Sequence, residues 1–257
     1  MKTNKEIEIG HVFSEKGHVH KLDGKRLTGV TTVLGVLDKP FLIPWAANMA
    51  VKYIMEHSEE RFNEEDQACR LVTYAELEGA KKAWVTVRDN AGDKGKDVHA
   101  IIEEIIKDVI VNSGGYIRSG KNPNKQVQKF IDWAIEKKVK FIASEKLVHS
   151  KSLFIGGICD FICEIDGKRF IGDIKTSKVI SPSYFWQTSA YDYCLNEMGE
   201  GLAGNYIIVR LGKDELDSEG KIIREGSFEV GENYAFDNNI SGFKSCLNIY
   251  RMLNLIK

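Results

Sequence analysis

Residues 156–178 read GGICDFICEIDGKRFIGDIKTSK, and this stretch decides the predicted fold. Apolar residues alternate with other residues over 155–165 and over 168–175, which is the pattern of two β-strands. Asp166-Gly167 between them is a favoured two-residue type I′ turn. The sequence therefore predicts a β-hairpin whose register follows from its turn.

That register brings two carboxylates together. If the turn holds only two residues, Asp160 lies directly opposite Asp173, and Lys175 projects from the same face as Asp173. Directly opposed residues hold their Cβ atoms about 4.5–5.5 Å apart. Because like charges so close destabilise a sheet unless a cation or a proton lies between them, the hairpin predicts a divalent-metal site. A bulge near Gly156-Gly157 or a longer turn would move Asp160 off its partner.

The composition is that of an ordinary globular protein. With 257 residues, of which 43% are hydrophobic, the chain can bury the core of one domain or of one domain with a helical lobe. A formal net charge of −1 leaves any nucleic-acid surface to local groups of Lys and Arg. The five cysteines form no CxxC pair and no zinc spacing, which favours a reducing cytoplasm. We expect neither a signal peptide nor a membrane span of about 20 apolar residues.

Helical and extended patterns alternate along the rest of the chain. Residues 6–30 predict a small β flap, and the acidic run SEERFNEEDQ predicts a solvated connection. Further strands are expected at 139–148, 205–211 and 227–234. Helices are expected at 31–37, from Pro44, at 74–90, 96–112, 125–138, 181–198 and 238–255. This order predicts a single domain, with a flap and helical lobe over 1–92 and an α/β core over 93–257.

A strand, a hairpin, a helix and a strand that carry an Asp and then Asp-x-Lys resemble the PD-(D/E)XK nuclease superfamily. Within it, the chain is most similar to the RecB-like exonucleases of the kind that bacteriophages encode. The resemblance covers about Thr31 to Leu211 and is densest from His99 to Tyr191, although Cys159 stands where the name of the motif has Pro. It implies an α/β (α+β) fold with a restriction-endonuclease-like core. A central mixed sheet would be flanked by helices and joined to an N-terminal helical lobe.

The resemblance implies roles for particular residues in a metal site. Asp160, Asp173 and the backbone carbonyl of Ile174 would hold Mg²⁺, with Mn²⁺ as a substitute, since hard cations prefer oxygen ligands. His99 matches a further metal ligand, and a packed, hydrogen-bonded histidine is the alternative. Glu145 matches an acidic position that borders such sites, and a strand-edge charge is the alternative.

The same resemblance places Lys175 and a Gln-x-x-x-Tyr motif beside the metal. Lys175 would position or help to deprotonate the attacking water. Gln187 and Tyr191 are four residues apart, so they share one helix face and could reach the site together. Candidate DNA contacts, since phosphates dominate affinity for nucleic acids, are Lys96, Thr176, Ser177, Lys178 and Arg210.

The implied function is a metal-dependent DNA exonuclease that hydrolyses phosphodiester bonds in phage recombination or DNA processing. A structure-specific or single-strand endonuclease is one alternative. A second is an inactive DNA-binding or assembly module that keeps the nuclease fold. We expect no iron–sulfur cluster, because no set of four cysteines flanks the motifs. The implied partners are DNA and a recombination or single-strand-binding protein, in the cytoplasm of a bacterial host.

Overall fold

A computed structural model describes residues 10–37, 39, 42–63, 67–212, 214–216 and 221–255, without the side chains of 90–96, 215–216 and 255. The chain divides into two compact units. The larger unit combines Met1–Leu37 with Val98–Lys257, and the smaller unit is Asp38–Asp97. The N-terminal flap therefore belongs to the same unit as the hairpin and not to the helical lobe.

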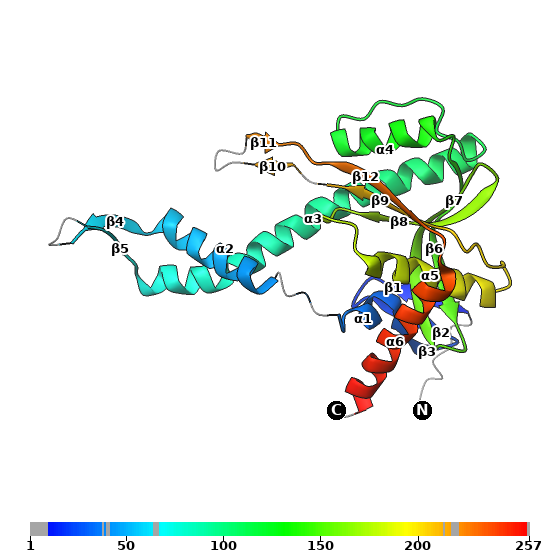
Figure 1. Cartoon of the computed structure of the whole chain (residues 1–257), viewed down its shortest axis with the longest axis horizontal. Helices are drawn as coiled ribbons and strands as arrows, with labels where there is room; N and C mark the ends of the chain where they lie inside the picture. Colours follow the sequence, from blue (N-terminus) through cyan, green and yellow to red (C-terminus); the bar gives the residue numbers. More distant parts are fainter. Residues whose placement is uncertain are drawn as a thin grey trace, which may run out of the picture. The chain divides into compact units, whose positions relative to one another are not determined.

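The larger unit is built on a mixed eight-stranded sheet (Figure 1). Its strands follow the order β1-β2-β3-β7-β8-β9-β12, and β6 also pairs with β7. The pairs β3–β7 and β8–β9 are parallel, whereas the other pairs are antiparallel. The prediction of an α/β fold with a central mixed sheet is confirmed. The strands are β1 (His11–Ser14), β2 (Val19–Leu22), β3 (Lys25–Gly29), β6 (Lys140–Ser150), β7 (Ile155–Ile165), β8 (Lys168–Lys175), β9 (Tyr206–Leu211) and β12 (Phe228–Asn233).

The central hairpin has the predicted bounds and the predicted turn. Strands β7 and β8 are joined by Asp166, with φ 50°, and Gly167, with φ 74°. A type I′ turn requires positive φ at both central residues, and Asp and Gly adopt it at low cost.

The predicted register of the hairpin is confirmed as far as the ladder runs. The five pairs run from Ile165↔Lys168 to Phe161↔Gly172. The ladder ends there, so Asp160 and Asp173 are the next residues beyond its last pair. The two aspartates therefore lie at the point where β7 and β8 stop sharing backbone hydrogen bonds.

Helices cover both faces of this sheet (Figure 1). One hydrophobic core lies under α4 (Lys125–Glu136) and the part of α3 (Tyr74–Asn112) that begins at Val98. A second core lies under α1 (Val30–Leu34), α5 (Pro182–Glu197) and α6 (Phe236–Leu255). The sheet is thus buried between two helical layers, as its apolar central strands require. No helix in the described residues is long and apolar enough to cross a membrane.

The smaller unit differs from the expectation in two places. It holds α2 (Leu42–His57), the first part of α3, and a hairpin of β4 (Glu59–Phe62) and β5 (Ala68–Leu71), where the sequence predicted only a solvated connection. Helix α3 is continuous, whereas the sequence predicted two helices separated by AGDKGK. Each glycine costs about 1 kcal/mol relative to Ala in a helix, which the good helix formers around them offset. In the larger unit, a further short hairpin of β10 (Glu215–Leu216) and β11 (Ile222–Arg224) lies between β9 and β12 in the chain.

Candidate functional site

Two carboxylates and an ammonium group meet where β7 and β8 part. Oδ2 of Asp160 accepts a hydrogen bond of 2.8 Å from the backbone N–H of Ile174 on β8. Lys175 Nζ lies 2.5 Å from Oδ2 of Asp173, whose side chain is fully buried. The sequence prediction that Asp160, Asp173 and Lys175 converge is therefore confirmed in the structure.

The charges at this point are not balanced. Burial raises the pKa of Asp173 to about 6, although Lys175 acts against this shift. Burial also raises the pKa of Asp160, against the effect of the same lysine. Oδ2 of Asp173 is buried, and its close partner is the ammonium group of Lys175. A fully buried and a partly buried carboxylate thus share one cation, and a further cation would stabilise both.

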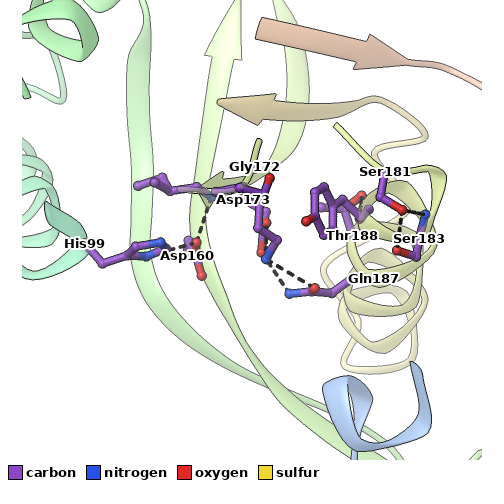
Figure 2. A network of polar contacts seen from close by, with 12 residues as sticks. His99, Asp160, Gly172, Asp173, Ser181, Ser183, Gln187 and Thr188 are labelled. Carbon is purple, nitrogen blue, oxygen red and sulfur yellow. Dashed lines mark hydrogen bonds and ion pairs between the residues drawn. The ribbon is translucent and has the colours of Figure 1, made fainter. Parts of the chain in front are cut away.

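Helix α5 presents polar groups to the two strands. It begins after Ser181, whose Oγ accepts a 3.4 Å hydrogen bond from Ser183 N, and Pro182 occupies its first position. Gln187 Nε2 donates to Oδ1 of Asp173 over 2.8 Å and to Oη of Tyr191 over 2.9 Å. Figure 2 shows Gln187 directed from α5 towards Asp173. The predicted Gln-x-x-x-Tyr face therefore lies against the aspartate.

Lys175 is bound from the helix as well as from the strand. Gln187 Oε1 accepts a 3.3 Å hydrogen bond from Lys175 Nζ, so the amide of Gln187 bridges the ammonium and Asp173.

The ring of Tyr191 packs directly on Gly157 of β7. A Cβ atom at Gly157 would lie only 2.5 Å from Cε1 of this ring. Gly157 therefore allows β7 and α5 to approach each other closely.

His99 reaches the same place from α3. Its Nδ1 lies 3.6 Å from Oδ2 of Asp160, and Figure 2 shows the ring directed at that carboxylate. Burial lowers the pKa of His99, while Asp173 and the backbone of Ile174 counteract the shift. A lowered pKa favours the neutral imidazole, which is the form that binds metals.

Glu145 on β6 has an unusual backbone. Its neighbours pair as Ser144↔Phe161 and Lys146↔Cys159, so the register of β6 and β7 puts Glu145 level with Asp160. Its φ is 49°, in the left-handed region that non-glycine residues seldom occupy. Burial raises the pKa of Glu145 to about 7, and Asp160 adds to the shift. A third carboxyl group thus lies within electrostatic reach of the aspartates, as the sequence predicted.

The predicted DNA contacts differ in their surroundings. Lys178 is exposed, while Thr176 and Ser177 are half-buried directly after β8. Arg210 is buried, and its guanidinium donates to Glu229 Oε2 over 2.7 Å, to Ser227 Oγ over 2.9 Å and to the carbonyl of Ser177 over 3.4 Å. Arg210 therefore binds the segment that follows Lys175, through the carbonyl of Ser177. The side chain of Lys96 lies outside the described residues.

One residue at the site was not among the predicted ones. The ring of Tyr184 lies with its centroid 5.1 Å from Lys175 Nζ. Tyr184 precedes Gln187 by three residues and Tyr191 by seven, so all three share one face of α5. That spacing is the signal in the sequence that could have identified it.

The donors at the site suit a hard divalent cation in kind. They are the carboxylates of Asp160 and Asp173, the carboxyl group of Glu145, the backbone carbonyl of Ile174 and the imidazole of His99. No three His, Cys, Asp or Glu side chains in the described part of the chain already stand as a ligand set. Here Lys175 contacts Oδ2 of Asp173, and the Ile174 N–H donates to Asp160. Two carboxylates with raised pKa values beside one ammonium group are the observation that fits a further cation best.

Comparison with known proteins gives no family. No family model matches the chain, and no curated protein matches it either. A solved structure described as the crystal structure of SSO0001 is 12% identical, with a TM-score of 0.35 over 84% of this chain and 87% of that chain. A likeness this distant carries no argument about function, so the site has to be interpreted from its own residues.

Proposed function

We propose that the protein is a metal-dependent deoxyribonuclease with a PD-(D/E)XK core, similar to the RecB-like exonucleases. The observation that carries the proposal is the meeting of Asp160, Asp173 and Lys175 where β7 and β8 part, a partly buried and a fully buried carboxylate against one ammonium. The approach of His99 from α3 and of Gln187 from α5 supports the same assignment. The hairpin, the following helix and the parallel strand β9 support the finer description of the fold.

The proposed ligands of the metal are Asp160, Asp173 and the carbonyl of Ile174, with His99 and Glu145 at its border. Bound Mg²⁺ would supply positive charge to a phosphate oxygen and lower the pKa of a water molecule. Gln187 would hold the carboxylate of Asp173 in one orientation through its 2.8 Å hydrogen bond.

Lys175 would act on the phosphate that is cleaved. Hydrolysis forms a bond between a water oxygen and phosphorus and breaks the bond to the 3′ oxygen. The water gives up one proton, and the leaving oxygen takes one. Burial alone would lower the pKa of Lys175, but Asp173 and Asp160 raise it. The side chain therefore stays charged at neutral pH, which favours orientation of the water and stabilisation of negative charge over a role as base.

The test is digestion of linear duplex DNA labelled separately at the two ends of each strand, beside closed circular DNA. Wild type should degrade the linear DNA with Mg²⁺ and not with EDTA. Lys175→Ala should be slower by about 100-fold or more, as when other charge-stabilising donors are removed. Lys168→Ala, an exposed lysine on the same strand, should match wild type.

The two substrates also separate the forms of the activity. The preference for ends, and the place in phage recombination with its partner protein, come from the resemblance alone. Nicking of circular DNA would indicate an endonuclease. Inactive wild type with both Mg²⁺ and Mn²⁺, or equal rates for wild type and Lys175→Ala, would contradict the proposal.

A further inference from the structure

Three groups surround the ammonium of Lys175. Nζ lies 2.5 Å from Oδ2 of Asp173 and 3.3 Å from Oε1 of Gln187. The third group is the ring of Tyr184, whose centroid is 5.1 Å from Nζ. We propose that Tyr184 is a positioning residue, which holds the ammonium of Lys175 in place through the face of its ring.

The ring is attached to a well-defined part of the helix. Tyr184 lies in the first turn of α5, and its backbone N–H donates a 3.0 Å hydrogen bond to the carbonyl of Ser181. The side chains of Ser181 and Ser183 are also hydrogen-bonded to each other over 2.8 Å. Because a capped first turn is ordered, the backbone that carries the ring is held in place.

A ring suits this task better than a second carboxylate would. Lys175 is the last residue of β8, and its flexible side chain has a carboxylate as its strongest partner. An aromatic face attracts the ammonium through its quadrupole but carries no net charge. Tyr184 therefore restrains the lysine without adding a further negative charge beside it.

The chain contains a matched contact away from the site. Lys244 Nζ lies 4.7 Å from the ring centroid of Tyr193, which is also on α5. The hydroxyl of Tyr193 is 3.2 Å from Ser152 Oγ. A change at Tyr193 therefore removes a similar cation–π pair from the same helix without touching Lys175.

The first measurement needs no catalysis. The ε-methylene protons of Lys175, assigned by their loss in Lys175→Arg, should show an upfield ring-current shift in the NMR spectrum of the full chain. Tyr184→Phe should keep the shift, Tyr184→Leu should abolish it, and Tyr193→Leu should leave it unchanged. Tyr184→Gln is the second variant, in case the leucine variant does not fold. A shift that survives in the folded leucine or glutamine variant would overturn the proposal.

The second measurement rests on the proposed nuclease function. On linear DNA with Mg²⁺, Tyr184→Leu should lower kcat about 3- to 30-fold, the range expected for a partly buried cation–π contact, with KM unchanged. Tyr184→Phe and Tyr193→Leu should match wild type. Equal losses in the Phe and Leu variants would overturn the positioning role. If wild type cleaves no DNA, the nuclease proposal fails, and the ring-current comparison alone decides whether Tyr184 holds Lys175.

Discussion

The backbone N–H of Ile174 donates a 2.8 Å hydrogen bond to the side chain of Asp160, directly after the ladder between β7 and β8 ends. A carboxylate of one strand thus takes the place of a backbone partner for the other. The residues on either side of Ile174 are Asp173 and Lys175, and both remain paired with β9. The β8–β9 ladder and the hydrogen bond from Ile174 to the Asp160 side chain therefore hold Asp160, Asp173 and Lys175 near one another.

Divalent cations should stabilise the folded protein. Mg²⁺ is expected to raise the melting temperature of wild type, because a ligand at 100 times its Kd adds about 2.7 kcal/mol to the free energy of unfolding. Asp173→Asn should lose this rise, since it removes the negative charge of a fully buried carboxylate that is a proposed ligand. Asp132→Asn, at an exposed carboxylate of α4, is the control. Calorimetric scans with Mg²⁺ and with EDTA would measure it, and an equal rise in Asp173→Asn would contradict the metal site.

Gly157→Ala should disturb the site by crowding the contact between β7 and α5. Its new Cβ would meet the Tyr191 ring at 2.5 Å, and Tyr191 is hydrogen-bonded to Gln187. We expect a loss of about 1–3 kcal/mol of stability, as in other overpacked cores, with a lower rate of DNA cleavage. Gly120→Ala is the control, because its Cβ would make only ordinary contacts at 3.6 Å. Chemical denaturation and a nuclease assay would test both, and wild-type behaviour of Gly157→Ala would argue against this packing.

Glu145→Gln should stabilise the protein in alkaline solution without divalent cations. The pKa of Glu145 is raised by burial to about 7, so its ionised form is disfavoured in the folded state. The stability that the carboxyl group contributes is present below its unfolded pKa and is lost as the pH rises through about 7. The gain for Glu145→Gln at pH 8 should be about 1–2 kcal/mol after solvent screening, and it should vanish near pH 4. Urea titrations in EDTA at several pH values would show the trend, and a gain that does not depend on pH would contradict it.

A cluster of three histidines should lower the stability of the folded protein as the pH falls, whereas Glu145 lowers it as the pH rises. His11 Nε2 lies 3.1 Å from His20 Nδ1, and the ring centroids of His11 and His149 are 5.2 Å apart. Burial lowers the pKa of His11 to about 4, and it also lowers those of His20 and His149. Because the unfolded chain takes up protons first, stability is expected to be full above about pH 6.5 and to fall towards pH 4.

His11→Phe tests this cluster, since it keeps a ring and removes the titrating group. Its melting temperature should fall less than that of wild type between pH 6.5 and pH 4. Melting curves over this range measure the difference. The same fall in both proteins would show that the cluster is not the cause.

Local chemistry explains what the sequence predicted well. The Asp166-Gly167 turn requires a particular backbone, and the turn then sets the register that brings Asp160 to Asp173. The motif resemblance indicated His99, Gln187 and Tyr191, and the structure brings all three to the aspartates or to their neighbours.

Other features depend on contacts that no local pattern contains. The parallel pairing of β8 with β9 joins segments separated by α5, so a periodicity in either strand does not reveal it. The left-handed backbone of Glu145 arises within a strand that otherwise looks regular in sequence. Tyr184 was missed because its role depends on where a lysine side chain of another element lies.

The central claim is that Asp160, Asp173 and Lys175 form a metal-dependent nuclease centre. The most direct measurement is the release of acid-soluble nucleotides from linear DNA by wild type and Lys175→Ala, each with Mg²⁺ and with EDTA. The account predicts release by wild type with Mg²⁺, none with EDTA, and a loss of about 100-fold or more in Lys175→Ala. Release that persists in EDTA, or that is equal in the two proteins, would contradict it.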